Sequence, residues 1–318
     1  MNGVFGHDAH FQAFAKALAS GRMHHGWIFA GPRGVGKARF AGEAARMLVD
    51  PENRFSAMVD HRTHPDIIWV QRLPKDAPKD GESADPDAEL KRSITIDQIR
   101  DVQHSLTTRP SMGARRVVII DAADDLERGG ANALLKSLEE PPVGTFFMLV
   151  SHASDRLLPT IRSRCQVMRF DALSDEDMRM ALQQSLPLAS SSEIDALVRS
   201  GRGLPGQAMM LAGMDFGAVE AVADEIVRSG DPANKLRHKL AETLSVKSAQ
   251  ASYEAFLRFV PVKIAAIGRS RPPEQAIVAV DAFHAADRLA ARAIGLTLDK
   301  QAVLLQMGNL LAGLHQRG

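Results

Sequence analysis

The 318-residue sequence has a single cysteine, Cys165. One cysteine excludes an internal disulfide and any zinc site built from several cysteines, and it fits a reducing compartment. The chain also has no apolar run of about 18 residues, the length that a membrane-spanning helix needs. Residues 1–10 lack the basic region and apolar stretch of a secretory leader. We therefore expect a cytoplasmic protein without disulfides.

An excess of charge of one sign is likewise missing. Lys and Arg number 39 and Asp and Glu number 38, which leaves a formal net charge of +1. The chain as a whole therefore has no field that would draw it to nucleic acid or to an acidic membrane, and any DNA contact must be a local patch. With 45% hydrophobic residues, the composition is that of a globular protein long enough for two or three domains.

Two pairs of histidines raise the question of a metal site. They are His24 with His25, and His61 with His64. A zinc site needs three or four converging ligands, and neither pair has a third ligand nearby in the sequence. We therefore predict packing or hydrogen-bonding roles for these side chains, and no metal.

The most informative stretch is Gly31 to Lys37, which reads Gly-Pro-Arg-Gly-Val-Gly-Lys between an apolar run at 27–30 and a helix-like segment at 38–49. The spacing G-x-x-x-x-G-K predicts a loop whose backbone N–H groups and lysine bind phosphate. The next residue is Ala38, where a Ser or Thr hydroxyl would ligate Mg²⁺. The sequence therefore predicts a nucleotide cradle without one of the groups that hydrolysis needs.

A second nucleotide motif is indicated by the apolar segment 115–121, which ends in Asp121. In hydrolysing ATPases of this type, an acidic residue follows such an aspartate and polarises the attacking water, but here Ala122 follows. Asp124 and Asp125 come later and are predicted to be solvated or to cap the next turn. The predicted nucleotide-binding residues are Gly31, Arg33, Gly34, Gly36, Lys37 and Asp121.

Strand-like and helix-like patterns alternate over the first 171 residues. The expected strands are 27–30, 66–71, 115–121, 145–151 and 166–170, and the expected helices are 11–18, 38–49, 94–106, 131–140 and 154–162. This alternation favours an α/β domain with a five-stranded parallel sheet and the phosphate loop at its carboxyl edge. Arg115 and Arg116, at the start of the third strand, are predicted to form a solvated edge. The polar segment 73–91 is predicted to be a solvated, mobile loop.

Only helical patterns follow this sheet. Residues 172–213 are predicted to form a small domain of three helices, which begin near Ser174, at Ser191 and within 201–206. Residues 214–318 are predicted to be all-α. Helices are expected there at 253–267, 274–293 and 298–314. This last region could fold as a self-contained bundle or bury one face against partner subunits.

Three motifs, in this order, resemble the AAA+ subunits of bacterial clamp loaders. They are residues 31–37, the run Asn-Ala-Leu-Leu-Lys-Ser-Leu-Glu-Glu-Pro-Pro at 132–142, and Thr-Ile-Arg-Ser-Arg-Cys at 160–165. The resemblance covers about residues 1–210, and the helical remainder agrees by class only. It implies an AAA+ P-loop α/β domain at 1–171, a helical lid domain at 172–213 and an all-α collar or oligomerisation domain at 214–318.

Three departures from the family's ATP-hydrolysing motor subunits, gamma and tau, affect one reaction. The motor subunits have a hydroxyl residue at the position of Ala38, an acidic residue at that of Ala122 and a γ-phosphate-sensing arginine at that of Gly206. Together the losses remove metal binding, water activation and charge stabilisation. The resemblance therefore implies a non-hydrolysing subunit that requires no cofactor and binds ATP or ADP weakly or not at all. The alternative is an active ATPase motor that uses Lys37 and Asp121.

One functional group of the family is intact, the arginine of Ser163-Arg164-Cys165. In clamp loaders this arginine projects into the nucleotide site of the neighbouring subunit and stabilises charge on the γ-phosphate in trans. The resemblance implies this arginine-finger role for Arg164, and the alternative is a structural arginine paired with a carboxylate. Cys165 is predicted to be a small packing residue, because the sequence places no base beside it.

The resemblance also implies partners. They are the gamma or tau subunits and the delta subunit in a hetero-oligomeric ring and, through that complex, the sliding clamp and primer–template DNA. The complex belongs to an enzyme with DNA polymerase activity, whereas the chain's own ATPase activity is expected to be absent. Subunits of this family commonly carry a four-cysteine zinc module, but residues 50–65 contain no cysteine, so no zinc is expected.

Overall fold

The computed structural model describes residues 4–75, 90–212, 216–246, 249–295 and 298–315. It contains two compact units, Met1–Gly206 and Gln207–Gly318, with the division inside helix α9 (Pro205–Leu211). Each unit is described by itself below. The three-domain division, with its boundaries after residues 171 and 213, stays a prediction.

The first unit is built on a parallel sheet of five strands in the order β2-β3-β4-β1-β5. The strands are β1 (Gly26–Ala30), β2 (Ile67–Val70), β3 (Arg116–Asp121), β4 (Thr145–Ser151) and β5 (Gln166–Arg169). The predicted α/β domain with five parallel strands is confirmed. Because β1 pairs with both β4 and β5, the loop after β1 leaves from the interior of the sheet's carboxyl edge.

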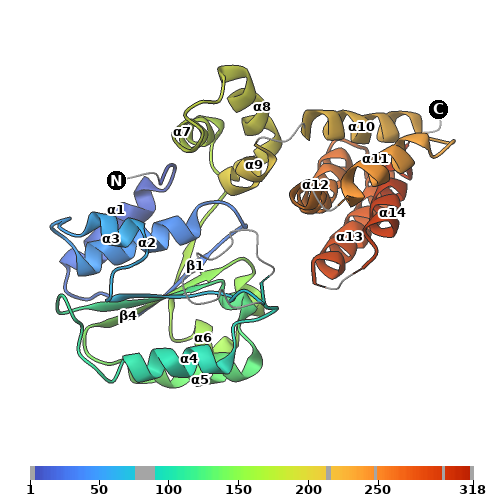
Figure 1. Cartoon of the computed structure of the whole chain (residues 1–318). Helices are drawn as coiled ribbons and strands as arrows, with labels where there is room; N and C mark the ends of the chain where they lie inside the picture. The colour runs from blue at the N-terminus through green and yellow to red at the C-terminus, as the bar shows by residue number, and fades with distance from the viewer. Residues whose placement is uncertain (1–3, 76–89, 213–215, 247–248, 296–297, 316–318) are drawn as a thin grey trace. The chain divides into compact units, whose positions relative to one another are not determined.

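Helices cover both faces of this sheet (Figure 1). One layer holds α1 (Asp8–Ala19), α2 (Lys37–Val49) and α3 (Ser56–Asp60), and the other holds α4 (Ile96–Ser105), α5 (Arg128–Glu139) and α6 (Pro159–Arg162). Neighbouring residues of β1 face opposite layers: Phe29 packs in one core with Phe40, whereas Ile28 packs in the other with Leu134. Both faces of the strand are therefore buried, which explains its continuous apolar run.

Several helix ends differ from the predicted ones. The helix expected from residue 94 begins at Ile96, because Thr95 forms a capping box with Gln98. The helix expected from residue 131 begins at Arg128. The single helix expected at 154–162 is wrong: a 3₁₀ turn, η2 (Ser154–Arg156), is followed by the separate helix α6. Pro159 explains the break, because proline is tolerated in the first turn of a helix and not in its interior.

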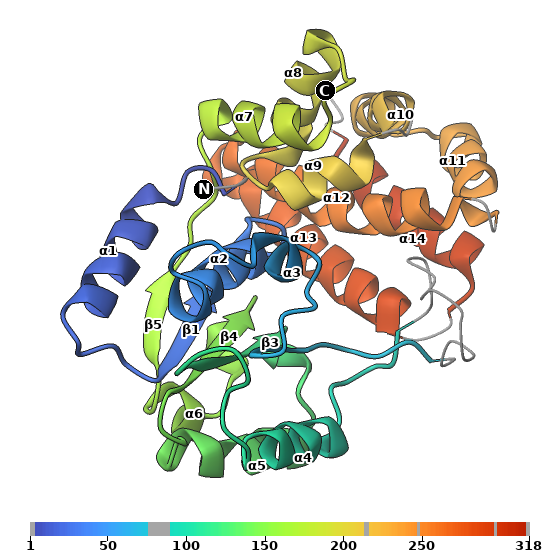
Figure 2. The ribbon, with the colours of Figure 1, turned by 60° about the vertical axis from the view of Figure 1, so that its left-hand side comes forward.

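Two further helices of the first unit, α7 (Asp175–Ser185) and α8 (Ser191–Gly201), pack against each other (Figure 2). The Ser174 side chain accepts a hydrogen bond from the backbone of Asp177, and the ion pair between Arg179 and Asp195, at 2.8 Å, joins the two helices. The predicted starts near Ser174 and at Ser191 are confirmed.

The described part of the second unit is all-α, as predicted. After α9 it contains α10 (Phe216–Ser229), α11 (Lys235–Ser245), α12 (Gln250–Arg269), α13 (Pro273–Gly295) and α14 (Lys300–Ala312). The last helix begins later than expected, because the Asp299 side chain caps it by accepting a hydrogen bond from Ala302.

The segment expected to be a mobile loop at 73–91 falls largely outside the described residues. Its two described ends meet: Pro74 and Leu90 form an antiparallel bridge, and the backbone N–H of Lys91 donates to the carbonyl of Leu73 over 2.7 Å. Among the helices that the structure describes, none is long and apolar enough to cross a membrane.

Candidate functional site

The predicted phosphate loop connects β1 to α2, with Gly36 as the N-cap of the helix at φ 108°. A side chain is excluded at Gly31, because a Cβ there would lie 2.2 Å from the carbonyl oxygen of Phe170, the residue after β5. Gly36 needs the positive φ that other residues rarely adopt. The two glycines that define the motif are therefore required by backbone conformation and by close packing, independently of any ligand.

Lys37 begins α2 and is only 3% exposed. Its ammonium group donates hydrogen bonds of 2.7 Å to the carbonyl oxygens of Gly31 and Pro32. Burial lowers the pKa of Lys37 to about 8, against the opposing influence of the Asp121 and Asp124 carboxylates. Arg33 is exposed in the loop, and its positive charge also lowers the pKa of Lys37.

Two more donors contact the phosphate loop from distant parts of the sequence. The buried His7 side chain donates through Nε2 to the carbonyl of Val35 over 3.0 Å, and the backbone N–H of Gly206 donates to the carbonyl of Gly34 over 2.8 Å. A Cβ at position 206 would lie 2.8 Å from the Cα of Gly34. The position at which the resemblance implies an arginine in motor subunits is thus packed too closely against the loop for a side chain.

The carboxyl edge of the sheet brings other predicted residues to the loop. Asp121, at the end of β3, pairs in register with Val150 of β4. Burial raises the pKa of the Asp121 carboxyl, and the positive charges of Arg62, Lys37 and Arg33 oppose this rise. The residue after it, Ala122, is buried and has only a methyl group. Ala38, in the first turn of α2, packs against the hydrophobic core.

His152 is a residue of this edge that the sequence analysis missed. It follows β4 directly, and its Nδ1 atom is buried with no hydrogen-bond partner among the described residues. Burial, together with the nearby charges of Lys37 and Arg33, lowers the pKa of His152 to about 4. Its position in the sequence could have identified it, because it directly follows a predicted strand, and the strands of a parallel sheet end at the same edge as the phosphate loop.

Asp124 holds the segment that contains His152. Its carboxylate accepts hydrogen bonds from the Ser151 hydroxyl at 2.9 Å and from the backbone N–H groups of His152 and Ala153 at 2.6 and 3.0 Å. The sequence predicts that this aspartate is solvated or caps a turn; in the structure it accepts from the backbone that follows β4, outside its own 3₁₀ turn η1 (Ala123–Asp125). Asp125 forms an ion pair with Arg72 at 3.1 Å.

Arg164 lies beside the start of β1, at the end of the sheet away from the phosphate loop. Its backbone carbonyl would be 3.0 Å from a Cβ at Gly26, the first residue of β1, whereas the phosphate loop follows the last. The guanidinium forms an ion pair with Glu139 at 2.6 Å, and its side chain is 35% exposed. This pairing is the structural alternative considered from the sequence, and the arginine-finger role stays a prediction.

Cys165, His24, His25 and His64 have structural roles. Burial raises the pKa of the Cys165 thiol to about 12, which suits a packing residue rather than a nucleophile. His25 donates to the carbonyl of Leu138 over 2.9 Å and stacks on His24, and His64 accepts from the backbone of Asp66. In the part of the chain that the structure describes, no three His, Cys, Asp or Glu side chains form a group that could hold a metal ion.

The prediction of a solvated edge at Arg115 and Arg116 is wrong for Arg116. Its side chain is buried and forms an ion pair with the buried Asp66 at 3.3 Å. The guanidinium also donates to carbonyl oxygens that follow or end α4, namely those of Ser105, Thr108 and Arg109. The Ser105 carbonyl also accepts from the backbone N–H and the hydroxyl of Thr108, so the arginine adds to the hydrogen bonds at this helix end.

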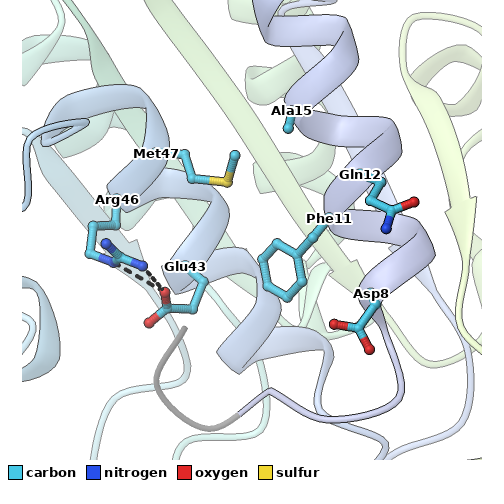
Figure 3. Close-up of a pocket in the computed structure, with 7 residues that line it drawn as sticks. All are labelled: Asp8, Phe11, Gln12, Ala15, Glu43, Arg46 and Met47. Carbon is cyan, nitrogen blue, oxygen red and sulfur yellow. Dashed lines mark hydrogen bonds and ion pairs between the residues drawn. The ribbon is translucent and has the colours of Figure 1, made fainter.

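A cavity of about 240 Å³ lies between α1 and α2 (Figure 3). Its lining residues are Asp8, Phe11, Gln12, Ala15, Glu43, Arg46 and Met47. Glu43 and Arg46 are paired with each other at its rim. None of the predicted nucleotide-binding residues lines this cavity.

Comparison with known proteins gives a consistent set of likenesses. The family model described as "DNA polymerase III, delta subunit" matches residues 6–174. The DNA polymerase III subunit delta' of Pseudomonas aeruginosa is 32% identical over 219 residues, covering 62% of this chain and 62% of the relative. The subunit of the same name from Escherichia coli is 28% identical over 234 residues, covering 70% of this chain and 65% of the relative. Gamma and tau subunits of DNA polymerase III also match.

The matches to these two delta' relatives span a little under two thirds of the relatives' lengths. A solved structure of a DNA polymerase III gamma subunit-related protein from Thermotoga maritima has a TM-score of 0.50 to this chain at 16% identity, covering 94% of this chain and 98% of the other. This last likeness is one of fold.

Proposed function

We propose a function from one premise: this chain belongs to the DNA polymerase III, delta subunit family, a family of clamp-loader proteins with the AAA+ fold. The proposal is that the chain is a delta'-type subunit of a DNA polymerase III clamp loader. It hydrolyses no ATP itself, supplies Arg164 to the nucleotide site of a neighbouring subunit and helps to place the sliding clamp on primed DNA. Its work is done in the cytoplasm, as part of the replication machinery.

The state of the chain's own nucleotide site supports the non-hydrolysing part of the proposal. A methyl group stands where a metal-ligating hydroxyl would be at Ala38, and another where a water-polarising acid would be at Ala122. At Gly206 no side chain fits, because of the contact with Gly34. Phosphoryl transfer depends on these three contributions together, so we expect no ATP turnover. Weak or absent binding of ATP or ADP is a separate part of the proposal.

The proposal that Arg164 acts on a neighbouring subunit is supported by its position relative to the loop that contains Lys37. They lie at opposite ends of β1, which is five residues long, a separation of roughly 15 Å along the strand. Arg164 therefore cannot reach a phosphate held by its own chain. A partly exposed guanidinium at this edge is available to a phosphate only if another subunit presents it.

The proposal includes two kinds of partner. One is an ATP-hydrolysing gamma or tau subunit whose nucleotide faces Arg164, and the other is the delta subunit that completes the hetero-oligomeric ring. Contact with the sliding clamp and with primer–template DNA is made through the complex.

The proposal is tested by two measurements. The isolated chain should show no ATP turnover above that of a Lys37→Ala variant; turnover that Lys37→Ala abolishes would favour the ATPase-motor alternative. In the complex reconstituted with the cognate gamma or tau and delta subunits, Arg164→Ala should lower clamp- and DNA-stimulated ATP hydrolysis by about tenfold or more, because arginine fingers are worth about 10³ to 10⁵ at a single site. Arg156→Ala, which removes an exposed arginine from η2, is the matched control.

A further inference from the structure

The Arg164 guanidinium is held from two sides by its own chain. Its Nη1 atom donates to the carbonyl of Thr160, inside α6, over 3.0 Å and to the hydroxyl of Ser163, the residue after α6, over 3.3 Å. Its Nη2 atom pairs with the carboxylate of Glu139, at 2.6 Å. Glu139 is the last residue of α5 and lies 25 positions away in the sequence.

The place of Glu139 is a poor one for a carboxylate whose only purpose is to stabilise its helix. The carboxyl end of a helix carries partial negative charge, which disfavours an acidic side chain there. A second carboxylate, Glu140, follows directly. Both side chains of the Glu139–Arg164 pair are partly exposed, at 49% and 35%, and exposed pairs add little to folding stability. The geometry therefore calls for a role other than stabilising the fold.

We infer that Glu139 is a positioning residue for Arg164, an inference that rests on the arginine-finger role proposed above. An arginine has five N–H donors in a planar fork, and the three contacts to Thr160, Ser163 and Glu139 leave others free for a phosphate. Glu139 fixes the plane of the guanidinium before the neighbouring subunit arrives. A finger that is already oriented loses less side-chain entropy when it meets the phosphate, and more of its interaction is then available in the transition state.

A competing role for Glu139 predicts the opposite effect of its removal on the rate of ATP hydrolysis. A carboxylate that merely occupies Arg164 would compete with the phosphate, and its removal would speed the reaction. A positioning carboxylate slows the reaction when it is removed.

The test uses the reconstituted complex and the kcat and KM for ATP in clamp- and DNA-stimulated hydrolysis. Glu139→Ala should lower kcat about two- to fivefold, which at 1.36 kcal/mol per tenfold corresponds to about 0.4 to 1 kcal/mol, with KM unchanged. Glu139→Gln keeps an oxygen acceptor of the same reach and should recover most of the loss. Glu140→Ala removes the neighbouring exposed carboxylate and should have no effect.

The double variant Glu139→Ala/Arg164→Ala decides whether Glu139 acts through Arg164. It should be no slower than Arg164→Ala alone, because a positioning residue has nothing left to position. The inference would be overturned if the double variant were slower than Arg164→Ala alone. It would also be overturned if Glu139→Ala left the rate unchanged or raised it. Either result would leave the finger role in place. An unchanged rate in Arg164→Ala would instead overturn the proposed function, and the inference with it.

Discussion

The backbone N–H of Gly206 donates a hydrogen bond of 2.8 Å to the carbonyl oxygen of Gly34, joining the start of α9 to the phosphate loop. This contact gives a structural reason for a glycine at position 206. From the sequence, Gly206 is a position where an arginine is missing. In the fold it is a position where backbone meets backbone, so the loss of the arginine accompanies a close packing that an arginine would disrupt.

Replacing Gly206 with alanine should lower the stability of the chain by about 1–3 kcal/mol, the usual cost of overpacking. The added Cβ would lie 2.8 Å from the Cα and 3.1 Å from the carbonyl oxygen of Gly34, and backbone atoms cannot move aside cheaply. Urea unfolding followed by circular dichroism measures the change. Gly113→Ala is the matched control, because the nearest atom to its Cβ would be 3.9 Å away. Equal effects of the two variants would show that the α9 contact tolerates a side chain.

Lys37 should make stability depend on pH above neutrality. Its pKa is about 8 in the folded chain against an ordinary value of 10.5, so between these values the unfolded chain binds more protons than the folded one. Stability therefore rises with pH across this window. Relative to Lys37→Met, which cannot titrate, the wild-type chain should gain about 3 kcal/mol between pH 7 and 10.5.

Denaturant unfolding at a series of pH values checks this prediction. Lys16→Met, which removes an exposed lysine from α1, controls for the loss of one positive charge. Parallel pH profiles for the wild type and Lys37→Met would contradict the prediction.

Breaking the buried ion pair between Asp66 and Arg116 should be costly. Arg116→Met leaves the Asp66 carboxylate buried without its counter-ion and should lower the free energy of unfolding by about 3–5 kcal/mol. Arg115→Met removes the neighbouring, half-buried arginine and should cost about 0.5 kcal/mol or less. The double variant Asp66→Asn/Arg116→Met should lose less than the two single variants together. Similar losses for Arg115→Met and Arg116→Met would refute this account.

Asp124 should keep the segment after β4 in place. Asp124→Ala removes the acceptor of two backbone N–H groups, those of His152 and Ala153, and should cost about 1–3 kcal/mol. Amide hydrogen exchange should become faster at both residues. Asp155→Ala, which removes an 88% exposed carboxylate, should leave their exchange unchanged. Protection of these two amides in Asp124→Ala would mean that another group holds the segment.

Local patterns predict much of this fold. The apolar runs locate all five strands to within about one residue at each end, and the glycine spacing locates the phosphate loop. Helix ends are less well predicted, because one capping side chain such as Thr95 moves the start of a helix by two residues. The break before Pro159 has a signal in the sequence, namely the proline itself, which the helical spacing of its neighbours obscured.

The sequence by itself determined the order of strands and helices, the phosphate-loop motif and the residues missing from it, because these depend on spacing along the chain. Only the tertiary structure decided that Arg116 is buried against Asp66, that His152 lies near Lys37 and Arg33 at the carboxyl edge of the sheet, and that Gly206 touches Gly34. It also decided that Arg164 meets Glu139 at the edge away from its own loop. The physical reason is that hydrophobic periodicity specifies which face of an element is buried, whereas the partner of a polar group is set by packing between segments that are far apart in the chain.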